Sequence, residues 1–165
     1  KIQTNVGQLP LHFAAQNVLL STVKLLLQEY PEGSKIQNND GQLPVHFAAQ
    51  NGHSMTAQLL FRDYPEGSKI QNNVGQLPLH IAAQNSLLST AKLLLQDYPE
   101  GAYYQHKVRQ SNLHFAAQNV LLSTAKLLLQ NYPEASKYKN QTGQSTIHFA
   151  AQNGNDSTTN LPFPA

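Results

Sequence analysis

A histidine set between apolar residues and followed by amide side chains is the first part of this sequence that could do chemistry. His12 lies in the stretch GQLPLHFAAQN, residues 7–17, with Gln16 and Asn17 one helical turn further on. Imidazole is the commonest general base of enzymes and a frequent metal ligand, so His12 could serve catalysis or bind a metal ion. The alternative is a buried, hydrogen-bonded histidine that stabilises a fold.

The histidine stretch recurs at a spacing of 34 residues, which favours the second interpretation. It reads GQLPVHFAAQN at residues 41–51 and GQLPLHIAAQN at residues 75–85, and two altered copies follow. Self-similarity at a fixed period of this size is typical of a stacked repeat architecture. The histidines of the five copies are His12, His46, His80, His114 and His148. Because an active site is normally built once, we interpret this histidine ladder as structural, and we expect its members to be buried and neutral.

The residue types and spacings also argue against metal binding and catalysis. Stacked helices lie ~8–10 Å apart, whereas a metal ligand lies ~2 Å from its ion, so successive histidines cannot share one metal ion. The chain has 0 cysteines, which excludes disulfides and thiolate metal sites. No set of nucleophile, base and acid recurs. The sequence therefore predicts no cofactor, no metal ion, no small-molecule substrate and no enzyme activity.

Length, charge and hydropathy limit the classes of partner. The periodicity of the 165 residues favours one continuous solenoid over an ordinary domain. A net charge of +2, with lysines and glutamates both repeating, argues against a nucleic-acid partner. No apolar run reaches the ~18 residues of a membrane span, so we expect no membrane insertion. The absence of cysteine and of a visible signal peptide favours a cytoplasmic location. We divide the chain into units at residues 1–34, 35–68, 69–102, 103–136 and, truncated, 137–165.

Each unit must position its histidine with a turn and two short helices, as the second unit illustrates. Residues 38–41, NNDG, form a turn, because Asn and Asp tolerate left-handed backbone and Gly adopts it readily. Pro44 suits the first turn of a helix over residues 45–50, and apolar residues at helical spacing predict a second helix over residues 54–63. Pro65 ends that helix, and YPEG predicts a type I turn. Helices this short persist only if neighbouring units bury their apolar faces.

The motif Gly-x-x-Pro-Leu-His-x-Ala-Ala, followed by a helix that ends in Leu-Leu, resembles the ankyrin repeat. The stretch NGHSMTAQLL at residues 51–60 is similar to that family's inter-helix turn, and the resemblance covers the whole chain. It implies an all-α repeat solenoid of stacked helix-turn-helix units with β-turn fingers, which binds protein partners through a concave face. Two features depart from the family: the period exceeds the usual value of about 33, and its threonine before proline is replaced by Leu9, Leu43 and Leu77.

The resemblance also places two sets of glutamines on the concave face. One set follows the turn and the other ends the first helix of a unit. Amide side chains there are either solvated filler in near-identical units or a polar surface for a partner. The candidate partner-binding glutamines are Gln42, Gln76 and Gln110 in the first set, and Gln50, Gln84 and Gln118 in the second.

The fourth unit departs from the others in its finger, and we take this region as the best candidate for a specific contact patch. It reads YYQHKVRQ at residues 103–110, where the second unit reads KIQNNDGQ. Tyr and Arg are enriched among the residues that dominate interface energies, and Arg109 replaces a finger glycine. Drift in a degenerating terminal repeat is the alternative. The patch comprises Tyr103, Tyr104, His106, Lys107 and Arg109 of the fourth unit with Tyr138 and Lys139 of the fifth.

These patterns predict a non-enzymatic scaffold that binds a protein partner through its concave face and fingers. Two alternatives stay open: a structural stacking segment of a longer array or large assembly, and a non-catalytic module of a larger enzyme. In the fifth unit Pro162 and Pro164 fall inside the expected second helix, which we predict to be broken. Leu128 and Leu129 of the fourth unit should then have an uncovered side. Such an end predicts continuation into further repeats, or end-to-end self-association.

Overall fold

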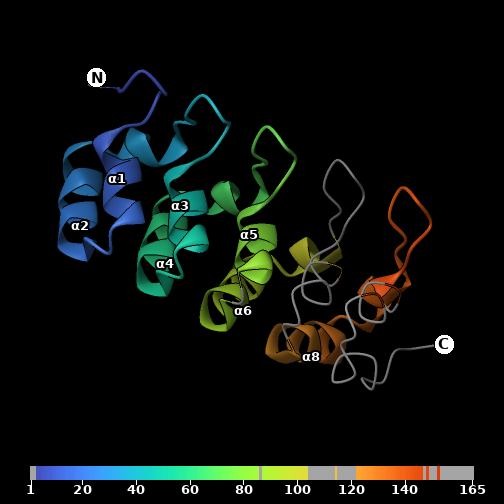
Figure 1. The fold of residues 1–165 in the computed structure, drawn as a ribbon. Coiled ribbons are helices and arrows are strands. Elements are labelled where there is room, and N and C mark those ends of the chain that lie inside the picture. Colours follow the sequence, from blue (N-terminus) through green and yellow to red (C-terminus); the bar gives the residue numbers. More distant parts are fainter. Residues whose placement is uncertain are drawn as a thin grey trace.

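The chain folds as a row of helix pairs that stand side by side in sequence order (Figure 1). The computed structural model describes residues 3–85, 87–103, 114, 122–146, 148 and 152. Over these residues the regular structure is entirely helical, and the loops between units project on one side of the row (Figure 1). The predicted all-α repeat solenoid is confirmed.

The first three units repeat one order of elements: a short α-helix, a ten-residue α-helix and a 3₁₀ helix. The first unit contains α1 (Pro10–Gln16), α2 (Leu20–Glu29) and η1 (Pro31–Lys35). The second contains α3 (Pro44–Gln50), α4 (Ser54–Asp63) and η2 (Pro65–Lys69). The third contains α5 (Pro78–Gln84), α6 (Leu88–Asp97) and η3 (Pro99–Tyr103). Further along the chain lie α8 (Leu122–Asn131) and η4 (Pro133–Lys137).

Local sequence explains where these helices begin and end. The first helix of the second unit begins at Pro44, one residue before the predicted start, because proline lacks only an N–H that the first turn leaves unpaired anyway. The second helix has its predicted bounds. The expected type I turn at YPEG is instead the start of a 3₁₀ helix. The N–H of Gly67 donates to the carbonyl of Tyr64 at 3.0 Å, and the N–H of Ile70 donates to the carbonyl of Gly67 at 3.4 Å. A type I turn and a 3₁₀ helix have nearly the same backbone dihedral angles, so the predicted turn can continue as a 3₁₀ helix.

The core runs without interruption from unit to unit, which is why such short helices persist. Helix α3 packs against α1 on one side and against α5 on the other. Ala48 and Ala49 are fully buried, since their small side chains let neighbouring helices approach closely. Apolar residues at helical spacing in α2, α4, α6 and α8 are buried in this core, with Leu26 and Tyr64 partly buried at its edge.

The prediction that the fourth unit has an uncovered side is wrong at its two named residues. Leu128 is 1% exposed and Leu129 is 7% exposed, values close to those of Leu94 and Leu95 one unit earlier. Burial requires only that chain atoms exclude water, whatever their secondary structure. The residues expected to form the broken helix, including Pro162 and Pro164, lie outside the described residues.

The fingers, which are the loops between one 3₁₀ helix and the next α-helix, are hydrogen-bonded to each other. The backbone N–H of Asn39 donates to Val6 at 3.0 Å, and its side-chain amide donates to the Asn5 carbonyl at 3.0 Å. Asn73 repeats both bonds one unit later, to the carbonyls of Asp40 (2.9 Å) and Asn39 (2.8 Å). These bonds fix the fingers at the spacing of the helices beneath them.

Candidate partner-binding surface

The ladder histidine of the first unit joins the start of its own helix to the finger of the next unit. The Nδ1 atom of His12 accepts the backbone N–H of Leu9 at 3.0 Å. Because a backbone N–H can only donate, the neutral ring must carry its proton on Nε2. That Nε2–H donates to the carbonyl oxygen of Gln42 at 3.1 Å. The His114 ring makes the equivalent bond to the Gln144 carbonyl, also at 3.1 Å.

Burial favours the neutral form of the rings of His12 and His46. His12, His46, His80 and His114 are all 0% exposed. Loss of hydration is the largest influence on both shifted rings: it lowers the pKa of His12, and it lowers the pKa of His46 to about 4. Hydrogen bonds from the backbone oppose the shift without cancelling it. The backbone of Gln76 raises the pKa of His46, although the Nε2 atom of His46 makes no hydrogen bond that meets the usual geometry.

The last ladder residue differs from the other four. His148 is exposed, so the expectation that it is buried is wrong. Its Nδ1 still accepts the backbone N–H of Ser145 at 3.2 Å and lies 2.8 Å from the Ser145 hydroxyl oxygen. The rings of His12 and His114 each bond to the finger of a following unit. Within the described part of the chain no such finger lies over His148.

The ladder gives no sign of metal chemistry. Across the residues that the structure describes, no three His, Cys, Asp or Glu side chains lie close enough together to hold a metal ion. The same residues include no helix that is long and apolar enough to cross a membrane.

The two sets of candidate glutamines contact each other in the third unit. Gln42 and Gln76, which follow the turn, are half-buried, whereas Gln50 and Gln84, which end the first helix, are exposed. The side-chain amide of Gln76 donates to Oε1 of Gln84 at 3.2 Å, which links the two sets directly. The backbone N–H of Gln76 donates to Oδ1 of Asn72 at 2.8 Å, so the finger fixes the backbone of Gln76. Gln110 and Gln118 lie outside the described residues.

Only Tyr103, Tyr138 and Lys139 of the predicted patch of the fourth and fifth units lie within the described residues. Tyr103 is the last residue of η3. In the fifth finger Tyr138 is half-buried and Lys139 is exposed. The remaining members, Tyr104, His106, Lys107 and Arg109, lie outside the described residues.

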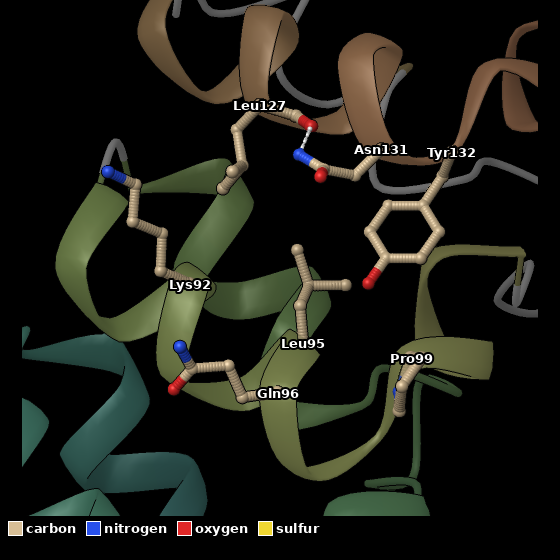
Figure 2. A pocket seen from close by; sticks show the side chains of 7 residues that line it. All are labelled: Lys92, Leu95, Gln96, Pro99, Leu127, Asn131 and Tyr132. Atoms are coloured by element: carbon tan, nitrogen blue, oxygen red, sulfur yellow. Dashed lines mark hydrogen bonds between the residues drawn. The ribbon is translucent and has the colours of Figure 1, made fainter.

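A groove between second helices was not predicted from the sequence. It has a volume of about 420 Å³ and lies between α6 and α8. In Figure 2, Leu95 points from α6 toward Leu127 and Tyr132 of the next unit, and Lys92 lies at the edge of the same space. A groove of about 400 Å³ between α2 and α4 has a similar lining, with Lys24, Leu27 and Leu59 among its residues. The lysines that recur in the second helices mark the position of these grooves, but from the sequence alone they indicated only a solvated helix face.

The comparison with known families agrees with this geometry. The sequence model of a family described as ankyrin repeats (3 copies) matches residues 11–108. The chain belongs to the ankyrin repeat family. Ankyrin repeats generally act as protein–protein interaction modules and are typically non-catalytic. A search of curated proteins found no match to this chain.

In its first three units this ankyrin chain holds the histidine without the hydroxyl that the family supplies. Leu43 occupies the position of the family's threonine, and its side chain is 1% exposed. The backbone N–H of Leu43 donates to Nδ1 of His46 at 3.1 Å, and Leu77 and His80 make the same contact at 3.2 Å. The backbone thus orients each ring, while the leucine side chain adds apolar burial that a threonine would not.

Proposed function

We propose that this ankyrin chain is a non-enzymatic scaffold that binds a protein partner through the glutamine face and the fingers. The glutamine face is defined by the described members of the two sets: Gln42, Gln50, Gln76 and Gln84. The observation that carries the proposal is the hydrogen bond between Gln76 and Gln84, which makes the finger base and the helix end one continuous polar surface. We further propose that the scaffold consists of the five units given above. A cytoplasmic location is consistent with a sequence that has no cysteine.

The chemistry of this face suits a polar protein surface. Each amide both donates and accepts hydrogen bonds, so a row of them can pair with backbone or side-chain groups of either kind. The histidine and asparagine bonds already fix the units beneath the glutamines, so the backbone loses little conformational freedom on binding. The patch formed by Tyr103, Tyr104, His106, Lys107, Arg109, Tyr138 and Lys139 would extend the face towards the last units and add aromatic and cationic anchors.

The proposal is tested by comparing two charge-altered variants in quantitative affinity purification from one extract. Gln50→Glu combined with Gln84→Glu changes the glutamine face, while Lys24→Glu combined with Lys92→Glu changes exposed residues of the second helices. Proteins captured by the unaltered chain and by the lysine variant, but lost with the glutamine variant, would support the proposal. Equal capture by both variants, or loss only with the lysine variant, would reject it.

A structural stacking segment remains the second candidate, and one observation favours it. Phe13 is 42% exposed in the first unit, whereas its counterparts Phe47 and Ile81 are each 6% exposed because a preceding unit covers them. The first unit thus presents a face that the other units bury.

A further inference from the structure

In each of the first three units an exposed asparagine follows the first helix. Asn17, Asn51 and Asn85 are the residues after α1, α3 and α5. The side-chain amides of Asn17 and Asn51 donate to the carbonyl four residues before them, at 2.8 and 2.9 Å. Asn85 donates to the Gln50 carbonyl of the preceding unit at 3.4 Å. The backbone ψ angles are also alike, at 25°, 3° and 13° in chain order, so the three asparagines form a matched set.

The residue after the asparagine differs between these units. It is Val18 in the first unit and Gly52 in the second, and both adopt the left-handed backbone, with φ of +58° and +72°. Val18 is 64% exposed. At Gly52 the joint with the third unit favours glycine, because a Cβ atom there would lie 2.7 Å from Cδ2 of Leu87. The packing of the second unit therefore retains an Asn-Gly pair that the first and third units lack.

The backbone nitrogen of Gly52 is available for reaction. The N–H groups on either side of it, those of Asn51 and His53, donate to carbonyls of α3 at 3.1 and 2.9 Å. The N–H of Gly52 itself makes no hydrogen bond to any group that the structure describes. By contrast, the N–H of the finger glycine Gly41 donates to the Asn38 carbonyl at 3.0 Å. Gly52 also has no side chain to shield its nitrogen, and glycine hinders backbone rotation least.

We propose that Asn51 is a site of spontaneous covalent modification, at which the backbone nitrogen of Gly52 displaces the side-chain amide. When the loop rotates about ψ of Asn51, the nitrogen gives up its proton to hydroxide and attacks Cγ. The N–Cγ bond forms, the Cγ–Nδ2 bond breaks, and the amide leaves as ammonia after taking a proton from water. Water then opens the resulting succinimide ring at either of its two carbonyl carbons. One product is aspartate, and the other is isoaspartate, in which the main chain passes through Cγ.

Either product weakens the link between the first and second units. His53 is the N-cap residue of α4, and its Nε2 lies 3.0 Å from the carbonyl oxygen of Gln16 in the first unit. Isoaspartate lengthens the main chain just before this loop, which displaces the His53 ring from that carbonyl. Aspartate replaces an amide donor with a carboxylate that repels the Phe47 carbonyl oxygen, because both groups only accept hydrogen bonds. Each event also adds one negative charge beside Gln50.

Peptide mapping of the unaltered, folded 165-residue chain after incubation in mildly alkaline buffer tests the proposal. Trypsin, which cleaves after lysine and arginine, releases the three asparagines in separate peptides, residues 2–24, 36–62 and 70–92. Mass spectrometry should show that Asn51 is converted at least about tenfold faster than Asn17 or Asn85. Fragmentation assigns the modified residue and identifies isoaspartate. A second Asn-Gly pair, at residues 153–154, lies outside the described residues and falls in a different peptide.

The first unit supplies a variant that should gain reactivity. Val18→Gly gives Asn17 the same neighbour as Asn51, at an exposed position whose φ is already +58°. Helicity by circular dichroism should be unchanged, and Asn17 should then be converted about as fast as Asn51. Val18→Ala is the matched control. It also shortens the side chain but keeps a Cβ atom beside the nitrogen, so Asn17 should be converted much more slowly than in Val18→Gly.

Two results would overturn the proposed site: equal conversion of the three asparagines in the folded chain, or a Val18→Gly variant in which Asn17 reacts no faster than before. The modified protein can be separated from the unmodified protein by ion exchange, because it carries an added negative charge. It should unfold at a lower temperature than the unmodified protein. An unchanged unfolding temperature would overturn the inferred weakening of the link through His53 and Gln16.

Discussion

Mild acid should destabilise this protein through its histidine ladder, with His46 making the largest resolved contribution. Burial lowers the pKa of the folded ring to about 4, against ~6.5 for an unfolded histidine. Between these values the unfolded chain binds a proton that the folded chain does not. The stability associated with the neutral ring is therefore complete above pH ~6.5 and is lost progressively as the pH falls towards ~4. His12 adds to the loss, since its pKa is lowered for the same reason.

The magnitude for His46 alone follows from the two pKa values. The full shift corresponds to about 3 kcal/mol, and about 2 kcal/mol of it should be lost between pH 7.5 and pH 5. Chemical denaturation followed by circular dichroism at both pH values measures the change in unfolding free energy. His46→Gln should remove about 2 kcal/mol of the pH-dependent change, even if it lowers stability overall. His148→Gln is the matched control, because His148 has the same place in the repeat but is exposed.

Two results would refute this reasoning. One is an unfolding free energy that is the same at pH 7.5 and pH 5. The other is a His148→Gln variant that loses as much of the pH dependence as His46→Gln does. If His46→Gln does not fold, an NMR titration of the unaltered chain separates the possibilities, because the His46 ring should remain neutral at pH 5.

Three further predictions concern the fingers, the core and the proposed patch. Gly41→Ala should lower the unfolding free energy by about 2 kcal/mol or more, because φ is +74° and the new Cβ would also meet the next finger. Gly143→Ala has a similar φ of +78° but no such contact, so it should lower the unfolding free energy by about 1 kcal/mol. Leu129→Lys should lower unfolding free energy by about 3 kcal/mol without specifically reducing self-association, since Leu129 is buried. Tyr104→Ala or Arg109→Ala should weaken partner capture by about 2 kcal/mol if these residues anchor the interface, and helicity by circular dichroism should be unchanged.

Much of the local structure could be predicted from the sequence because local residues determine it. Pro44 begins a helix and Pro65 ends one through the geometry of their own rings. The finger turn depends on Gly41, which adopts φ of +74°. The helix over residues 54–63 follows from apolar residues at helical spacing. Fivefold recurrence then indicated stacking, the structural role of the histidines and the ankyrin family, without any knowledge of contacts between units.

Only the tertiary structure decided which copies of a repeated residue are buried. His46 and His148 occupy the same position of the repeat, yet His46 is fully buried and His148 is exposed, because the finger of a following unit covers His46. Leu129 is buried although the sequence predicted an uncovered side. The bond between Asn73 and Asn39 joins residues 34 positions apart, and the groove beside Leu95 lies between two units. A sequence pattern reports what a residue can do, but burial and hydrogen bonding across a joint depend on atoms that a distant part of the chain provides.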